Sequence, residues 1–389
     1  MIMGRPVRAV IAVSAVVVAF GSGAATVLVA DRPSQQSKAA SQINQAITTI
    51  EGHAAHPVPR ATLQQAAVQG MLSALGDRWA TYYNRANYRR FQHVLSGRYT
   101  GVGMWVRRGP AGSLRVRSVE PDSPADRAGV RRGDRILAVQ GQSVAGKPVA
   151  SVTDQLRGKA GTDVSVELAN EAGQVKSLSL SRTLIDEGDV TTSMITPTVE
   201  CIRISAFTAG VGAKVRTLVA DAQRRHYTGL VLDLRDNPGG LLDEAVETAS
   251  VFISHGPIVT YVQRGEAPKT LDALGGANTA MPLVVLVNGA TASAAEILAS
   301  ALQDHGRAVL LGSQTFGKGT VQAPERLADG AAIELTVGHY LTASGHSLEG
   351  VGITPDVLIP PDTPESIVDS RAIEVLSGLT ADAGSSGRG

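Results

Sequence analysis

The chain has 389 residues, of which 43% are apolar, 18% charged and 4% aromatic. This apolar share is enough for buried cores, so it excludes a wholly disordered chain, and the length predicts two or three domains. The net charge is only +1, which argues against nucleic acid or an anionic surface as the main partner. The single cysteine, Cys201, excludes an internal disulfide, and no HExxH pattern is present, so neither a metal nor another cofactor is expected.

Residues 9–30 contain no charge and follow Arg5 and Arg8. A helix over this run would cover roughly 33 Å, which is enough to cross a bilayer core. We therefore expect one transmembrane helix that anchors the chain, with its amino end in the cytoplasm. A signal peptide cleaved after Ala30 is the alternative, and both interpretations place the remaining chain outside the cytoplasm.

Residues 31–96 begin as a polar stalk and continue as a helical region from Ala61 to Leu95, with a break at Gly76-Asp77. Five of the fourteen aromatic residues of the chain lie between Trp79 and Phe91. We expect this region to form a helical collar that packs on the body of the protein.

Short strands and turns are predicted over residues 97–184. Strands are expected at 114–119, 135–139, 162–170 and 175–181, a short helix from Pro124 to Gly129, and a second helix at 149–158. The segment resembles a PDZ domain in the circularly permuted arrangement of bacterial proteases, most specifically in SPADRAGVRRGDRILAVQG (123–141). The resemblance implies that backbone N–H groups of a loop hold a terminal carboxylate while the next strand adds the peptide to the sheet. The loop consists of Gly101, Val102, Gly103 and Met104.

Apolar strands alternate with helices after about residue 191. Expected strands cover 201–207, 229–235, 257–262, 281–288 and 308–313, and an alternating strand follows at 331–342. This pattern predicts an α/β fold with a largely parallel sheet that is covered on both sides. The last residues, ADAGSSGRG (381–389), are of low complexity and are expected to be disordered.

A serine lies where the apolar strand 281–288 leads into a helix. Ser293 and Glu296 form the S-x-x-E pattern of a capping box, and helix capping alone explains a serine at this position. The alternative is a hydroxyl presented at the open end of the sheet, with the Ala294 N–H near enough to stabilise an oxyanion.

A lysine between glycines follows in FGKGTVQ (316–322). If residues 318–322 form a strand, Lys318, Thr320 and Gln322 share one face. A lysine acts as a base only when it is neutral, so its pKa of about 10.4 must fall by roughly three units. Burial in an apolar pocket without a carboxylate partner can supply such a shift.

Residues 281–322 resemble the carboxyl-terminal processing peptidases, or tail-specific proteases, which are serine endopeptidases with a Ser/Lys dyad and a PDZ domain. The family pattern S-A-S-A-S-E corresponds to TASAAE (291–296), so the resemblance implies that Ser293 is the nucleophile. Thr291 and Ala295 replace the two outer serines of the family pattern. FGKGTVQ (316–322) implies Lys318 as the general base and Gln322 as the residue that orients it.

The same resemblance implies further roles and a fold. DLRDNPGG (233–240) implies Gly239 as an oxyanion donor beside Ala294, with Thr315 and Glu296 at supporting positions. The resemblance covers about residues 61–360 and implies a ClpP/crotonase-like α/β core.

Two residues near the carboxyl end of the helix are expected to have no catalytic role. Asp304 lies about 16 Å and His305 about 18 Å from Ser293 along a continuous helix. We predict that Asp304 forms a structural ion pair with Arg307.

The predicted domains are an anchor or signal (1–30), a stalk and helical region (31–96), a PDZ domain (97–184), a serine protease core (185–365) and a partly disordered tail (366–389). The expected function is a membrane-anchored, extracytoplasmic endopeptidase that captures protein or peptide substrates by their free carboxyl termini and cleaves through an acyl-enzyme. Switching by an activator or adaptor protein is also implied by the resemblance. The alternative is a tethered PDZ adaptor in which the protease motifs survive only as packing.

Overall fold

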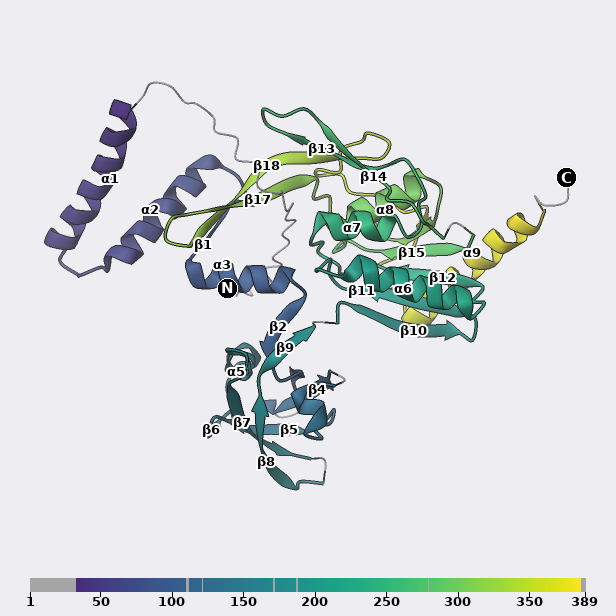
Figure 1. Cartoon of the computed structure of the whole chain (residues 1–389), viewed down its shortest axis with the longest axis horizontal. Coiled ribbons are helices and arrows are strands. Elements are labelled where there is room, and N and C mark those ends of the chain that lie inside the picture. Colours follow the sequence, from purple (N-terminus) through teal and green to yellow (C-terminus); the bar gives the residue numbers. More distant parts are fainter. Residues whose placement is uncertain are drawn as a thin grey trace, which may run out of the picture. The chain divides into compact units, whose positions relative to one another are not determined.

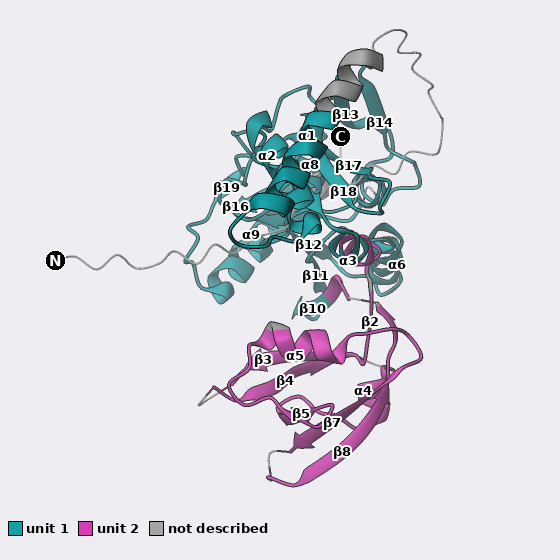
Figure 2. Ribbon diagram, turned by 90° about the vertical axis from the view of Figure 1, so that its left-hand side faces the viewer, with its two compact units in different colours: residues 1–90, 192–389 teal, residues 91–191 magenta. Residues whose placement is uncertain are grey.

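The computed structural model describes residues 33–109, 112–120, 122–170, 172–186, 188–278 and 280–385. It contains two compact units, residues 1–90 with 192–389 and residues 91–191 (Figures 1 and 2). The predicted membrane span, residues 9–30, lies outside the described residues. Within the described ranges no helix is long and apolar enough to cross a membrane, and no cluster of three or more metal-ligating side chains occurs.

The first unit contains a six-stranded sheet in the order β10-β11-β12-β15-β16-β19. All pairs from β11 to β19 are parallel. Every residue of β12 and β15 is buried, which is typical of a parallel sheet covered on both faces. The elements of this layer are β10 (Val190–Thr196), β11 (Val199–Ile204), α6 (Val211–Arg224), β12 (Gly229–Asp233), α7 (Leu242–Ala249), β15 (Leu283–Val287), α8 (Ala294–Asp304), β16 (Val309–Gly312), β19 (Val357–Leu358) and α9 (Glu365–Ser385).

Helix α9 packs on this sheet through Val368, Ala372 and Leu376. It extends to Ser385, so the prediction of disorder from residue 381 onward is wrong up to that residue. The composition is low in complexity, but Ala381 and Ala383 favour helix, and the apolar positions earlier in α9 anchor it.

A second, antiparallel sheet of the first unit has the order β1-β18-β13-β14, and β17 also pairs with β18. Its strands are β1 (Thr81–Tyr83), β13 (Pro257–Gln263), β14 (Lys269–Asp272), β17 (Thr320–Arg326) and β18 (Ala332–Thr342). Strand β17 begins at Thr320. Lys318, which the predicted strand over 318–322 included, therefore lies just before the observed strand.

The amino-terminal part of the first unit contains α1 (Pro33–His53), α2 (Arg60–Leu75) and the start of α3 (Arg85–Leu95). Gly76 ends α2 in a left-handed conformation, as the predicted break requires. The predicted helix across residues 79–84 is wrong, because Thr81–Tyr83 instead pair with Glu334–Ala332 of β18. Aromatic and β-branched residues favour a strand where a partner edge is available.

The second unit contains a six-stranded antiparallel sheet, with five strands in the order β3-β4-β5-β7-β8 and β6 beside β5, and a separate pair β2-β9. Its apolar core includes Val116, Val139, Val152, Val164 and Leu168. The elements are β2 (Arg98–Gly101), β3 (Met104–Arg108), β4 (Leu114–Val119), α4 (Pro124–Arg127), β5 (Arg135–Val139), β6 (Gln142–Ser143), α5 (Val149–Leu156), β7 (Asp163–Ala169), β8 (Val175–Ser181) and β9 (Thr183–Asp186). The predicted strands and both predicted helices are present with shifts of one or two residues at their ends.

Candidate active site

Ser293 lies at the turn between β15 and α8, at the carboxyl edge of the parallel sheet. It is fully buried and has a φ of 58° and a ψ of −119°, a backbone conformation that non-glycine residues rarely adopt. Strained backbone of this kind persists only where the surrounding structure holds it, and it is concentrated at functional sites. The Ser293 hydroxyl has no hydrogen-bond partner among the described residues.

Glu296 explains how this turn is held. Ser293 and Glu296 are placed as in a capping box, and the Ser293 N–H donates to Glu296 Oε2 at 2.8 Å. The same oxygen accepts the Lys318 N–H at 2.9 Å, while Oε1 accepts from the Gly317 N–H and the Thr315 hydroxyl. One buried carboxylate oxygen therefore joins the backbone N–H of Ser293 to that of Lys318.

Lys318 is only 1% exposed. Burial lowers the pKa of its amine from 10.5 to about 8, although the nearby carboxylates of Glu334, Glu349 and Asp77 act in the opposite direction. The expectation that burial lowers the pKa of Lys318 is confirmed. The expectation that no carboxylate lies near the amine is wrong. Burial has the largest effect because an ammonium loses its hydration when it is enclosed.

Trp79 covers this amine, and the sequence analysis gave it no role. The Lys318 Nζ lies 4.5 Å from the centre of the Trp79 ring, and the ring makes an edge contact with Phe316 at 6.1 Å. Asp77 fixes the segment, because its carboxylate accepts from the N–H groups of Trp79 and Thr336. The only features of the sequence that pointed to this segment were the break at Gly76-Asp77 and the aromatic cluster after it.

A second buried carboxyl near Lys318 belongs to Glu334 of β18. Burial raises its pKa, and one oxygen accepts from the Tyr83 hydroxyl at 2.8 Å. Its other oxygen has no partner in the described part of the chain. Because β18 is an alternating strand, a glutamate within it gave no sign from sequence that it would face inward.

Gln322 is also buried, with its amide nitrogen donating to the hydroxyls of Thr320 and Thr336. Its Oε1 makes no hydrogen bond to the residues described. These two hydrogen bonds fix the orientation of the Gln322 amide. Its oxygen therefore remains available as a hydrogen-bond acceptor, on the strand that follows Lys318 along the chain.

Gly239 lies against Ser293. Its φ is 102°, and a Cβ built on it would stand 2.9 Å from Ser293 Cβ and 3.0 Å from Ala294 N. Only glycine fits this approach. The Gly239 N–H donates to Asn237 Oδ1 at 2.8 Å, so this amide is already bonded in the structure, whereas Ala294 occupies the first turn of α8, where N–H groups lack helical acceptors.

The loop that contains Gly239 is joined directly to the loop that contains Ser293. The Ala292 N–H donates to Asn237 O at 2.9 Å, and Asn288 bonds Asp236 twice, through Asp236 N at 3.0 Å and Asp236 Oδ1 at 2.9 Å. Asp236 has a φ of 61°, so this clasp holds a second strained residue.

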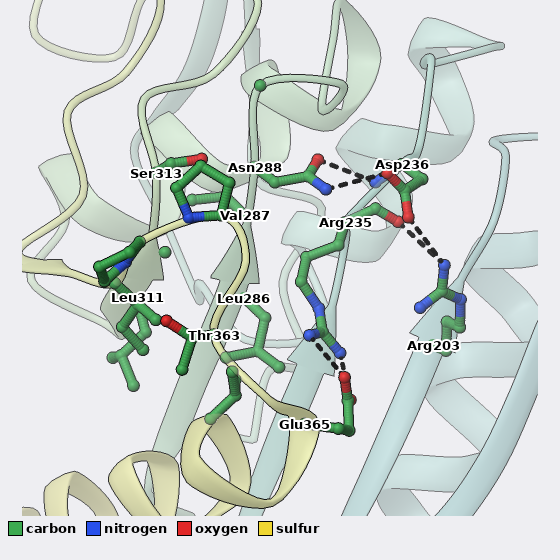
Figure 3. A pocket seen from close by; sticks show the side chains of 16 residues that line it. Arg203, Arg235, Asp236, Leu286, Val287, Asn288, Leu311, Ser313, Thr363 and Glu365 are labelled. Carbon is green, nitrogen blue, oxygen red and sulfur yellow. Dashed lines mark hydrogen bonds and ion pairs between the residues drawn. The ribbon is translucent and has the colours of Figure 1, made fainter.

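A pocket of about 490 Å³ borders both loops at the carboxyl ends of the parallel strands (Figure 3). Asp236 and Asn288 stand on one side, and the ion pair of Arg235 with Glu365, at 2.6 Å, crosses another. Two hydrogen bonds to Asp233 and two to Glu365 fix the Arg235 side chain and raise its pKa. The guanidinium is thus a structural support at the base of the Gly239 loop.

The two residues expected to be non-catalytic have structural partners. His305 is bonded to Pro257 O at 2.7 Å. The predicted ion pair of Asp304 with Arg307 is absent from the described residues: Asp304 accepts from Ser344, and Arg307 donates to carbonyls of Phe252, Asn278 and Met281. Arg307 lies beyond the end of α8 and bonds these backbone carbonyl groups instead of Asp304.

The second unit has a groove of about 180 Å³ between β3 and α5. Three of the four predicted loop residues, Gly101, Val102 and Met104, line it, together with Tyr99, Trp105, Val106, Thr153, Leu156 and Arg157. Gly103 faces away, since a Cβ on it would stand 2.1 Å from Ser123 Cβ. The lining is mainly apolar, as the side chain of an apolar terminal residue requires.

Each unit is similar to a known protein family over part of its length. Residues 198–359 match the model of peptidase family S41, and residues 115–170 match a PDZ domain. The chain is 31% identical over 341 residues to the chloroplastic carboxyl-terminal-processing peptidase 3 of Arabidopsis thaliana, covering 84% of this chain and 65% of that protein. It is 35% identical over 297 residues to the carboxy-terminal processing protease CtpA of Bacillus subtilis, covering 76% of this chain and 63% of that protein.

Among solved structures, the photosystem II D1 C-terminal processing protease is similar to this chain with a TM-score of 0.51 and 28% identity. The match covers 85% of this chain and 95% of that structure. The chain spans slightly less than two thirds of the length of the two sequence relatives.

Proposed function

We propose that this chain, which belongs to peptidase family S41 through residues 198–359, is a serine endopeptidase of the carboxyl-terminal processing class. The observation that carries the proposal is the single carboxylate of Glu296, which joins the Ser293 and Lys318 amides while Lys318 is buried with a pKa of about 8. Nucleophilic catalysis by a serine needs a hydroxyl that is not already bonded and a base that loses its proton easily, and Ser293 and Lys318 supply these two groups.

In the first step, neutral Lys318 Nζ takes the proton of Ser293 Oγ as this oxygen attacks the scissile carbonyl carbon. The ammonium then gives the proton to the leaving nitrogen, the C–N bond breaks and an ester on Ser293 remains. Water, deprotonated by the same amine, hydrolyses the ester and restores both residues. The Trp79 ring stabilises the ammonium that exists between these transfers. Gln322 Oε1 has no partner in the described structure, and in this proposal it becomes the acceptor that orients Nζ during the reaction.

The oxyanion is held by the N–H groups of Ala294 and Gly239. Because the Gly239 amide is bonded to Asn237 Oδ1, it exchanges this neutral acceptor for the charged oxygen when substrate is present. Charge-assisted hydrogen bonds are roughly twice as strong as neutral ones, which favours the exchange.

The groove of the second unit captures the substrate by its free carboxyl terminus. Its apolar lining and the backbone of Gly101–Met104 fit a peptide added to β3. The proposal also places the catalytic part outside the cytoplasm, on an anchor formed by residues 9–30. The support is the uncharged run itself and the arginines before it. The ClpP/crotonase-like class of the core stays a prediction.

Two variants test the dyad against the alternative of a silent PDZ adaptor. Ser293→Ala and Lys318→Ala are each compared with the unchanged chain for cleavage of an unfolded protein such as casein, with circular dichroism as the folding control. Both variants are expected to lose cleavage and to keep peptide binding. An unchanged chain that binds peptides but cleaves nothing, with or without the peptide present, would support the adaptor.

A further inference from the structure

Three arginines form a row across the sheet of the second unit. Arg107 on β3 is directly opposite Arg115 on β4, and Arg115 is directly opposite Arg135 on β5. Directly opposed residues of antiparallel strands point to the same face, with Cβ atoms about 4.5–5.5 Å apart. The row therefore lies on one face of the sheet, and Arg107 and Arg135 are exposed.

No carboxylate of the described residues forms an ion pair with any member of this row. Arg115 donates to the carbonyl oxygen of Gly133 at 2.7 Å. Glu167, on β7, lies opposite Ala138 rather than Arg135 and makes no ion pair with it. Like charges that face one another across strands destabilise a sheet. Because these arginines form no ion pair with the described carboxylates, the described part of the unit does not neutralise the positive charge of the row.

The row begins at the strand that borders the groove. Strand β3 is at the end of the sheet order, and in the part of the unit that is described only β4 pairs with it. Helix α5 lies beside β3 (Figure 2). The groove between them is lined by Met104 and Val106 on one side and Leu156 on the other. A peptide that pairs with this free edge of β3 as a further strand brings one of its own side chains beside Arg107, at the end of the arginine row.

The register of an added strand identifies which peptide residue meets Arg107. With the terminal residue opposite Met104, next to the loop that holds the carboxylate, antiparallel pairing proceeds one residue for one residue. The third residue before the carboxyl-terminal one then lies opposite Arg107, and its side chain points to the same exposed face. Arg108 follows at the next position of β3.

We propose that the second unit selects carboxyl-terminal segments with an acidic residue at the third position before the carboxyl-terminal one, which Arg107 contacts and Arg115 and Arg135 favour at longer range. This inference rests on the proposed capture of carboxyl termini and specifies the class of substrate captured. The apolar groove binds the last residues of the peptide, and the arginine row attracts a negatively charged side chain outside the groove.

The test measures binding of dye-labelled peptides to the full chain carrying Ser293→Ala, in mild detergent, by fluorescence anisotropy. The peptides share the same apolar end and differ at one position, which is Asp, Asn or Lys. At low salt we expect the Asp peptide to bind about threefold more tightly than the Asn peptide and about tenfold more tightly than the Lys peptide. Moving the Asp along the peptide should give a maximum at the third position, and added salt should reduce the difference.

Arg107→Glu should reverse the order of the Asp and Lys peptides, whereas Arg132→Glu, an exposed arginine in the turn before β5 and outside the row, should leave it unchanged. Equal binding of the three peptides, or the same order after Arg107→Glu, overturns the inference. A peptide with an amidated end separates the two proposals: if it binds as tightly as the free acid, the capture of carboxyl termini fails, whereas loss of charge selection with intact carboxylate selection overturns only the arginine row.

Discussion

Replacing Lys318 with methionine removes a buried amine and keeps an apolar side chain of similar length. The structure encloses this amine beneath Trp79, and burial lowers its pKa from 10.5 to about 8. Enclosing an ammonium destabilises the folded state, so the variant should be more stable than the unchanged chain at the pH values where Lys318 is protonated.

The size of the effect follows from the two pKa values. Each pKa unit is 1.36 kcal/mol, so the shift corresponds to about 3 kcal/mol of folding free energy below pH 8. Between pH 8 and 10.5 the unfolded chain binds more protons at this residue than the folded chain does, so stability rises with pH in this window. From pH 8 to 9.5 the unchanged chain should gain about 1.5 kcal/mol relative to Lys318→Met.

The assay is urea unfolding at several pH values, followed by tryptophan fluorescence. The chain has only two tryptophans, Trp79 in the first unit and Trp105 in the second, so a Trp105→Phe background makes Trp79 the reporter of the first unit. Lys214→Met, at an exposed position on α6, is the control and should not alter the pH dependence. Parallel curves for the unchanged chain and Lys318→Met would refute the reasoning.

Three further outcomes are expected. Gly239→Ala should lower kcat at least a hundredfold, because its Cβ would stand 2.9 Å from Ser293 Cβ, whereas Gly265→Ala, with a similar φ and open space, should keep activity; equal losses would contradict this. Glu296→Gln turns a donor toward backbone N–H groups and should lower the free energy of unfolding by about 3–5 kcal/mol, measured by urea denaturation. Asn288→Ala removes both bonds of the loop clasp and should lower kcat at least tenfold with little change in KM; an unchanged kcat would show that the clasp is not needed.

The sequence predicted most of the two folds because their signals are local. Apolar periods placed the strands of the parallel sheet, and turn glycines and Ser123 placed the elements of the second unit. The order of the strands and the antiparallel sheet that contains β1 were not predicted, because long-range pairing such as Tyr83 with Ala332 leaves no trace in the pattern of either segment.

At the site, the motifs marked the candidate residues but did not predict the residues that surround them. The backbone N–H groups of Ser293 and Lys318 are joined through Glu296, which the motif had marked only as a supporting residue. Trp79 comes from a segment more than two hundred residues away and Glu334 from another strand. Their effect on the lysine depends on tertiary burial, so spacing along the chain could not reveal it.

The pH dependence of kcat/KM for peptide cleavage tests the central claim most directly. A lysine base must lose its proton before it can act, so the rate should rise with pH through a single apparent pKa of about 8 and then level off. A rate that is flat across this range, or that rises near the pKa of about 6.5 typical of histidine, would contradict the assignment of Lys318.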